Sequence, residues 1–477
     1  MLHVPLLRAG RAYKSLDVAR VAHHATRRSF AEVSQANSGL IRRDLLGQRE
    51  ARAALARFSV SELLDRCREA ADAFMHATLP LGTDSQGPED YVEQLSATTG
   101  MPYAMVRGNM QRVATVLTNL TDILHGLTRG LDLTVLDRGY AEHDGQMVSF
   151  APRTQALGVV LPSNSPGVHG LWVPSIPLKT PLVLRPGNSE PWTPFRLVQA
   201  MMQAGIPADA FFYFPSDHAG AGEIVRQCGR SMFFGDVASV GLFATDPRVE
   251  IHGPGYTKVI VGPDMAAEAP TRHLEVIARS VSANGGRSCV NASGVWMSSN
   301  AEAMAHALAE TLAAIEPRAV DDPAAQIAPF ADAELARRID AQIDTALQEP
   351  GALDVTARYR SGPRLVEREG SVYLRPTVIF CDSASHALAN REFLFPFVSV
   401  VRVTDQEMAA MPDCLGATLA AMVLTADEAL VRRLLASDRI SRLNIGPIAT
   451  NEIAWNQPHE GNLFEHLYSR RSLQRTA

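Results

Sequence analysis

The stretch NGGRSCVNA, residues 284–292, presents a single thiol, Cys289, shortly after two glycines. A run with helical spacing precedes it, and the strand-like run 294–297 follows it. Glycines allow backbone conformations that other residues avoid, and they let the chain approach a ligand closely. A thiol in such a loop becomes an effective nucleophile when its pKa is lowered or when a base lies nearby. A buried structural cysteine fits the same pattern, so the choice depends on the rest of the chain.

Strands and helices alternate on both sides of this loop. The alternation predicts an α/β fold with parallel sheets, in which ligands bind at the carboxyl ends of the strands. Gly220-Ala221-Gly222 is too short and misplaced to be a GxGxxG dinucleotide fingerprint. The expected strands are 157–161, 182–185, 211–214, 232–234, 258–261, 372–380, 398–403 and 418–424, and the expected helices are 193–204, 217–228, 301–315 and 332–347.

The flanking regions have patterns of their own. One helix is expected from Ser61, and a longer one over 102–127 with Pro102 in its first turn. Residues 146–150, preceded by His-Asp-Gly, read as a β-hairpin suited to subunit contact. The aromatic and basic tail, 451–477, is not low in complexity, and we expect it to pack against the rest of the chain.

The composition is that of a soluble globular protein with two or three domains: 477 residues, 46% hydrophobic and 20% charged. The net charge of −6 gives no basic surface for nucleic acid. No apolar run approaches the roughly 20 residues that span a bilayer. The five cysteines lack CxxC or Cys/His ligand spacing, so neither a disulfide framework nor a metal site is expected. A cytoplasmic location fits best.

Five stretches, in order, resemble motifs of the aldehyde dehydrogenase superfamily. LPSNSP at 161–166 resembles its asparagine-containing loop, and LVLRP at 182–186 resembles its strand ending in Lys-Pro. FFGD at 233–236 resembles the Phe-Thr-Gly-Ser turn, and GRSC at 286–289 resembles the Gly-Gln-x-Cys nucleophile loop. YLRPT at 373–377, followed by EFLFP at 392–396, resembles Pro-Thr followed by Glu-x-Phe-Gly-Pro. The resemblance covers about residues 140–445, and its order and spacing favour a catalytic Cys289.

The resemblance implies NAD(P)-dependent oxidation of an aldehyde to a carboxylic acid. Cys289 would add to the carbonyl, and the Asn164 amide with the Cys289 backbone N–H would stabilise the oxyanion. Hydride would then pass to the nicotinamide, leaving a thioester on Cys289. Glu250 is expected to act as the base, or to position the water, that releases the acid. His252 is the weaker candidate for that role. The segment from 249 to 258 departs from the usual Glu-Leu-Gly-Gly-Lys.

Further residues are assigned to the cofactor by the same resemblance. Pro162, Ser163 and Gly235 would lie along it, Arg185 would hold the adenosine ribose in place of the usual lysine, and Glu392 would bind the nicotinamide ribose. Asn188 stands where NAD-preferring members often carry an acid. Either NAD or NADP is therefore expected, and Arg185 with Asn188 leaves room for NADP.

Three parts are expected. Residues 1–138 and 154–262 would form a cofactor-binding domain with a parallel sheet, and residues 263–445 an α/β catalytic domain. Residues 139–153 and 446–477 would form a small β oligomerisation element and tail, in a homodimer or homotetramer. The expected partner is a small-molecule aldehyde, with no nucleic acid and no membrane.

Three features of the sequence leave alternative functions open. Phe395 replaces the glycine of Glu-x-Phe-Gly-Pro, and the 102–127 helix resembles that of acyl-CoA reductases. The segment around Glu250 resembles CoA-linked semialdehyde dehydrogenases. The alternatives are a CoA-acylating aldehyde dehydrogenase or acyl-CoA reductase, for which CoA is a further partner, and a catalytically inactive family member that serves as a binding subunit.

Overall fold

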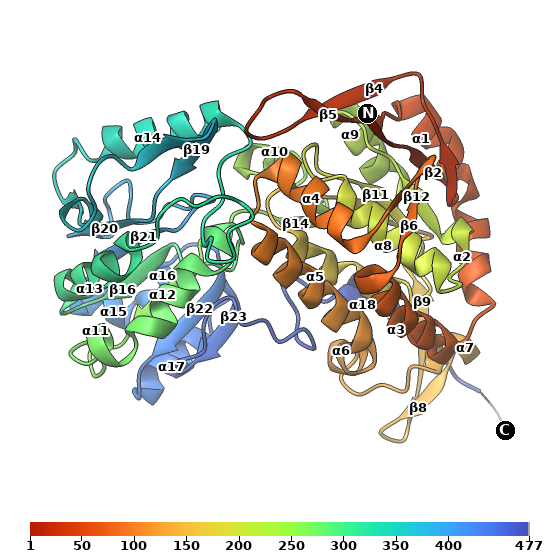
Figure 1. Cartoon of the computed structure of the whole chain (residues 1–477). Coiled ribbons are helices and arrows are strands. Elements are labelled where there is room, and N and C mark those ends of the chain that lie inside the picture. The colour runs from red at the N-terminus through yellow and green to blue at the C-terminus, as the bar shows by residue number, and fades with distance from the viewer. Residues whose placement is uncertain (476–477) are drawn as a thin grey trace.

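Two seven-stranded sheets organise the chain in the computed structural model, which describes residues 1–475 (Figure 1). In the first sheet, five neighbouring strands run parallel, and β2 joins β12 in the antiparallel direction. The parallel α/β arrangement expected from the alternating pattern is confirmed. The order is β14 (Val249–His252), β13 (Arg230–Phe234), β10 (Leu157–Val160), β11 (Leu182–Arg185), β12 (Phe211–Tyr213), β2 (Leu6–Arg8) and β3 (Arg11–Tyr13).

Helices cover both faces of this sheet because alternate strand residues point to opposite sides. Leu182 and Leu184 of β11 pack into one core cluster, whereas Val183 packs into another. The first cluster includes residues of α3 (Val60–His76), α5 (Tyr103–Thr118) and α8 (Trp192–Gln203), and the second includes residues of α1 (Ser38–Asp44), α2 (Gln48–Ala56) and α9 (His218–Gln227).

The second sheet is parallel except at its edge strand β17. Its order is β17 (Ala352–Asp354), β20 (Thr377–Cys381), β21 (Phe397–Arg402), β16 (Gly294–Met297), β15 (Lys258–Val261), β22 (Thr418–Leu424) and β23 (Ile440–Ile445). One face packs on α12 (Leu274–Ser282) and α13 (Ala301–Ala313), and the other on α14 (Ala333–Ala346) and α17 (Glu428–Leu435).

The assignment of strand 258–261 to the first sheet is wrong. β15 pairs with β16 and β22 of the second sheet, and β14 forms the edge of the first. Both are short strands, and both partners of β15 come later in the chain, at 294–297 and 418–424, so local periodicity does not indicate which sheet it joins. The passage from the first sheet to the second therefore falls between 252 and 258.

The helix expected over 102–127 is two helices, α5 and α6 (Leu120–Leu127), separated at Asn119. The side-chain amide of Asn119 donates to the carbonyl of Thr115, a local bond that competes with continuation of the helix. The helix expected from Ser61 begins at Val60, with Ser59 as its N-cap in a capping box with Glu62.

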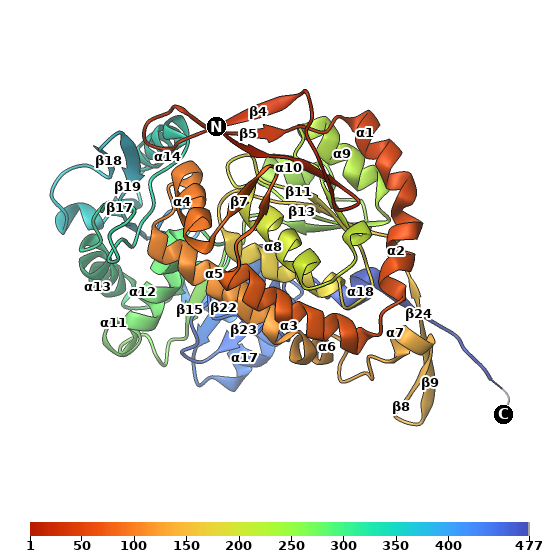
Figure 2. The same cartoon turned by 45° about the vertical axis from the view of Figure 1, so that its right-hand side comes forward.

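A small antiparallel sheet contains β24 (Tyr468–Arg471), β9 (Gln146–Pro152) and β8 (Ala141–His143). The expected hairpin is confirmed, and Asp144 and Gly145 at its tip both have positive φ, as a tight hairpin turn requires. Residues 476–477 of the tail lie outside the described residues. Before them the tail packs as expected, through β24 and through α18 (Leu463–Leu467), which lies next to β24 in Figure 2. Among residues 1–475, no helix is both long and apolar enough to cross a membrane.

Candidate active site

A cavity of about 770 Å³ lies where loops of the two sheets meet. Three lining segments, 162–165, 234–236 and 252–254, come at the carboxyl ends of the neighbouring strands β10, β13 and β14. Two others, 287–290 and 392–394, come before the amino ends of the neighbouring strands β16 and β21. The cavity therefore joins the carboxyl edge of the first sheet to the amino edge of the second.

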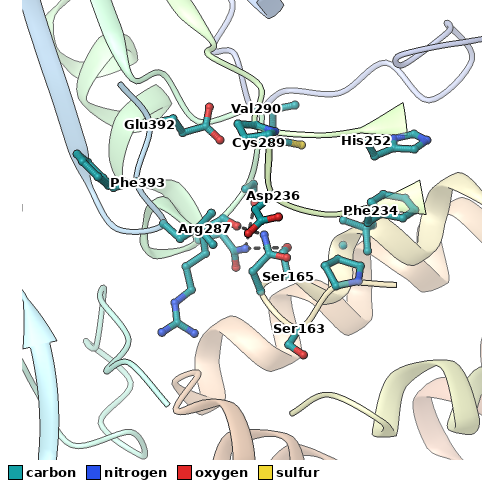
Figure 3. Close-up of a pocket in the computed structure, with 18 of the residues that line it drawn as sticks. Ser163, Ser165, Phe234, Asp236, His252, Arg287, Cys289, Val290, Glu392 and Phe393 are labelled. Atoms are coloured by element: carbon teal, nitrogen blue, oxygen red, sulfur yellow. Dashed lines mark hydrogen bonds between the residues drawn. The ribbon is translucent and has the colours of Figure 1, made fainter. Parts of the chain in front are cut away.

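Cys289 lies on the wall of this cavity, at the end of the glycine loop (Figure 3). Gly285 and Gly286 have φ of 65° and 67°, and a Cβ at Gly286 would lie 2.4 Å from the carbonyl carbon of Phe395. The loop needs glycine for both its left-handed backbone and its close approach to Phe395. Burial, and then the carboxylates of Glu460 and Glu392, raise the pKa of the Cys289 thiol well above its usual range. The free protein therefore holds a protonated thiol.

Asn164 lines the same cavity and is tied to the nucleophile loop. Its side-chain amide donates to the carbonyl of Arg287, at 2.8 Å. Arg287 itself points away from Cys289 in Figure 3 and donates to the carbonyls of Thr99 and Pro329. The arginine thus anchors the loop, and the amide of Asn164 is held against the backbone two residues before Cys289, with one N–H in use.

Glu250 is not among the cavity-lining residues of the described chain, whereas His252 is. The two lie on the same face of β14, two residues apart, and Nε2 of His252 is 3.0 Å from Oε1 of Glu250. A Cβ at Gly461 would lie 2.3 Å from Oε2 of Glu250, so this carboxylate faces the backbone of the C-terminal tail. His252 and the tail lie around the oxygens of Glu250, and the role of Glu250 as base or water-positioner stays a prediction.

His252 lies between two carboxylates, since its Nδ1 is 2.7 Å from Oε2 of Glu460. Burial alone would lower the pKa of His252, but Glu460 and Glu250 raise it to about 10. Burial opposes ionisation of Glu460, yet His252 lowers the pKa of Glu460 to about 2. The ring also stacks on Phe234, with centroids 4.2 Å apart. A charged imidazolium therefore lies between two carboxylates, in the order Glu250–His252–Glu460, and of these three residues His252 lines the cavity.

The tail contributes a second histidine, His459, to the cavity. Sγ of Cys289, a ring nitrogen of His459 and a carboxylate oxygen of Glu460 lie within 4.8 Å of one another. Burial lowers the pKa of His459 to about 4, with Glu460 opposing and the Arg442 guanidinium assisting, so this imidazole is neutral at pH 7. The thiol therefore has a neutral imidazole and an ionised carboxylate as neighbours.

Glu392 lines the cavity and accepts hydrogen bonds from the backbone N–H groups of Gly255 and Tyr256, at 3.2 and 2.5 Å. Burial raises the pKa of Glu392 to about 7, against the effect of these N–H groups and of Lys258. The nearby ammonium of Lys258 donates to the carbonyl of Tyr256, and burial lowers the pKa of Lys258 to about 8. Glu392 is thus held by two backbone N–H groups and has a pKa near neutrality.

The other residues assigned to the cofactor divide into two groups. Pro162, Ser163 and Gly235 line the cavity. Arg185 is buried, and its guanidinium donates to the carbonyls of Ser216 and Pro186 and to Oδ1 of Asn188. The donors of Arg185 are thus directed to protein acceptors, and its contact with the adenosine ribose stays a prediction, as does the choice between NAD and NADP.

Sequence reasoning missed Glu460 and His459. They belong to the run PHEG at 458–461, in a tail that is otherwise aromatic and basic. The one local signal was a glycine directly after an adjacent imidazole and carboxylate, in a segment without secondary structure of its own. No spacing rule connects that segment to residues 250–252, which lie about two hundred positions earlier.

The chain matches the family model described as "Aldehyde dehydrogenase family" over residues 14–463. A search of curated proteins finds no match. Among solved structures, a putative aldehyde dehydrogenase from Burkholderia cenocepacia shares 18% identity at a TM-score of 0.79, over 99% of this chain and 97% of that one. An NAD-dependent aldehyde dehydrogenase from Sinorhizobium meliloti shares 18% identity at a TM-score of 0.79, over 100% of this chain and 96% of that one. A 3,6-anhydro-L-galactose dehydrogenase in complex with NAP shares 16% identity at a TM-score of 0.78, over 98% of this chain and 99% of that one. These structures show the fold, and because the family model covers most of its length, the chain belongs to the aldehyde dehydrogenase family.

Proposed function

We propose that this protein is an NAD(P)-dependent aldehyde dehydrogenase that oxidises an aldehyde to a carboxylic acid through a thioester on Cys289. Family membership supports an oxidoreductase that acts on aldehydes. The observation that carries the finer proposal is that Cys289, Asn164 and Glu392 line one cavity. A nucleophile, an oxyanion donor and an acceptor for a sugar hydroxyl are the groups that this reaction needs.

In the first step, the thiol loses its proton and sulfur adds to the aldehyde carbonyl. The ionised carboxylate of Glu460 and the neutral imidazole of His459 are the neighbouring groups that can receive a proton, directly or through water. The resulting oxyanion would be stabilised by the side-chain amide of Asn164 with the backbone N–H of Cys289. Such donors act most strongly in a site that excludes water.

The cofactor's role is to accept the hydride that leaves the tetrahedral adduct. Glu392 could bind the nicotinamide ribose of the cofactor. Each of its carboxylate oxygens accepts a hydrogen bond from a backbone N–H group and can accept a second one from a ribose hydroxyl. Asp236 fits the pyrophosphate of the cofactor less well. Its carboxylate lines the cavity at the N-terminus of α10 (Val237–Gly241), where it would repel the negative charge of a phosphate. The nicotinamide end of the site therefore fits better than the phosphate end.

For release of the acid, we infer that Glu460 orients the attacking water. Its carboxylate oxygen lies within 4.8 Å of Sγ of Cys289, which leaves room for a bridging water. Glu250 would act as a positioning residue, by fixing the ring of His252 from the other side. Because a pKa of about 2 makes Glu460 a weak base, orientation is the larger part of this role.

The proposal is tested by following reduced-cofactor formation with a panel of aldehydes, with NAD or NADP, and with or without CoA. Turnover without CoA supports hydrolytic release. Turnover only with CoA would replace it with acyl transfer to CoA. If no aldehyde supports hydride transfer with either cofactor, the proposed function is wrong.

Replacing Asn164 with alanine is expected to lower kcat by roughly 10²–10³-fold, because one oxyanion donor is lost. KM for the aldehyde should change little, since the donor acts mainly on the tetrahedral adduct. Steady-state kinetics measure both constants. Asn119→Ala, an exposed amide at the junction of α5 and α6, serves as the control and should keep kcat. Equal kcat for the two variants would contradict the role of Asn164.

Replacing Glu392 with glutamine is expected to raise KM for the cofactor by about tenfold, through loss of a charge-assisted acceptor. In the wild type, cofactor affinity should rise between about pH 6 and 8, because the carboxylate with a pKa of about 7 is ionising over this range. The variant should lack that rise. Cofactor binding followed by fluorescence at several pH values measures both effects, and a pH profile unchanged by the substitution would argue against this assignment.

A further inference from the structure

Arg112, on α5, is the feature of the cavity that the proposed reaction leaves unexplained. Its side chain lines both the main cavity and a smaller one of about 340 Å³ next to it. The two cavities also share Ala283 and Asn284, which come just before the nucleophile loop. Arg112 is thus the cation at the junction of the two spaces.

Arg112 is exposed and lines both cavities, and its guanidinium has no hydrogen-bond or ion-pair partner among residues 1–475. The other cavity-lining arginine, Arg287, is engaged with two backbone carbonyls. Arg107, which lies five residues earlier on the same helix, is paired with Glu89. A guanidinium carries five donors in a planar fork that matches a carboxylate or phosphate. The five N–H donors of Arg112 are therefore free of protein acceptors within the described chain and available to a ligand in the cavity.

A second unpartnered polar group lies one turn away. Asn109 is 1% exposed and lines the smaller cavity, and its Oδ1 has no hydrogen-bond partner within the described chain. Its amide nitrogen donates to Oδ1 of Asn284, which fixes the orientation of the side chain. The junction therefore has a cationic donor and, one turn away, a buried acceptor, which can take a hydrogen bond from a hydroxyl or a water but not from a carboxylate or phosphate.

The surroundings belong to the substrate side of the site. Val168, Leu171 and Trp455 line the main cavity together with Arg112. They come together around Gly170, where a Cβ would lie 2.7 Å from the Trp455 ring and 3.1 Å from Val116, one turn after Arg112 on α5. Within residues 1–475, the smaller cavity contains none of the residues assigned to the cofactor. An apolar wall thus adjoins the cationic junction.

We propose that Arg112 binds an anionic group at the far end of the substrate, so that the preferred aldehydes carry a carboxylate or phosphate. The inference rests on the proposed function, which places the aldehyde carbon at Cys289. The apolar wall of Val168, Leu171 and Trp455 accommodates the chain between the two ends. Arg112 is a specificity-determining residue in this account.

The test compares 4-oxobutanoate with butanal, which have the same carbon chain, and glyceraldehyde 3-phosphate with glyceraldehyde. Wild-type kcat/KM should favour the anionic member of at least one pair by about tenfold or more. Arg112→Gln should remove most of that preference by slowing the anionic substrate, while butanal stays within about twofold. Arg107→Gln should behave like the wild type. The pair with the larger preference identifies the anionic group as carboxylate or phosphate.

Calorimetry with succinate and with inorganic phosphate separates this proposal from the proposed function, because neither probe needs to be oxidised. Binding that is lost in Arg112→Gln supports the anion subsite even if no aldehyde turns over, an outcome that would reject only the dehydrogenase. Equal slowing of charged and neutral aldehydes by Arg112→Gln would overturn the proposal. So would weakened NAD(P) binding with an unchanged substrate preference, which would assign Arg112 to the cofactor.

Discussion

Cys289→Ser is expected to lower aldehyde oxidation by on the order of 10⁴-fold or more. A serine hydroxyl is a far weaker nucleophile than a thiolate at neutral pH, and the residues around Cys289 do not supply a base matched to a hydroxyl. Glu460 has a pKa of about 2 and His459 one of about 4, so both are too weak to activate serine. Initial rates of reduced-cofactor formation with the best aldehyde of the panel measure the effect.

Cys414→Ser is the matched control, because Cys414 is the other thiol that is only partly buried. It lies on α16 (Met411–Cys414), among the residues packed on one face of the second sheet. This variant should keep wild-type kcat. If both serine variants were equally active, the chain would not use Cys289 as its nucleophile, and the binding-subunit alternative would regain support.

His252→Gln is expected to destabilise the folded protein by about 3–5 kcal/mol, because it leaves two buried carboxylates, Glu250 and Glu460, without their shared cation. His252 is 5% exposed, so solvent does not screen the loss. Activity should fall as well, since Glu460 would lose the partner that holds its carboxylate beside Cys289. Urea unfolding followed by circular dichroism measures the free energy of unfolding.

The pH dependence of this difference has a defined sign. The folded-state pKa of His252, about 10, lies above its ordinary value of 6.5, so its stabilising contribution is fully present below about pH 6.5. It is lost as the pH rises through about 10. The lowered pKa of Glu460, about 2, adds stability that is present above about 4.5 and lost as the pH falls towards 2. The difference in unfolding free energy between the wild type and His252→Gln should therefore be largest between about pH 4.5 and 6.5.

His76→Gln is the control for this prediction. His76 is also 3.0 Å from a carboxylate, that of Asp72, but both side chains are exposed. Exposed pairs contribute little, so the change in unfolding free energy should stay below about 1 kcal/mol at every pH. If His252→Gln had the same free energy of unfolding as His76→Gln at pH 6, the charges assigned to Glu250, His252 and Glu460 would be wrong.

The local features of the site were predictable because they follow from short-range rules. The glycines before Cys289 indicated a left-handed loop, and the alternating strands indicated a cavity at strand ends. Asn164, Pro162, Ser163, Gly235 and Glu392 were identified through the resemblance, and they line the cavity. In each case the signal lay within a few residues of the position it identified.

The features that the sequence does not predict are contacts between distant segments. Glu250 was chosen for its residue type and spacing before the thiol, but its environment is set by His252 and by the tail near Gly461. The resemblance assigns Arg185 to the adenosine ribose, and its guanidinium donates to the loop after β12. Burial and long-range partners decide what a charged residue can do, and neither is encoded in local spacing.

Trapping the covalent intermediate tests the central claim most directly. The protein is mixed with NAD(P) and an aldehyde that turns over, quenched in acid within the first turnover, digested and examined by mass spectrometry. We expect an acyl group on the peptide that contains Cys289, formed in step with the first equivalent of reduced cofactor and absent from Cys289→Ser. Reduced cofactor formed at the wild-type rate by Cys289→Ser, or an acyl group on another residue, would contradict the account.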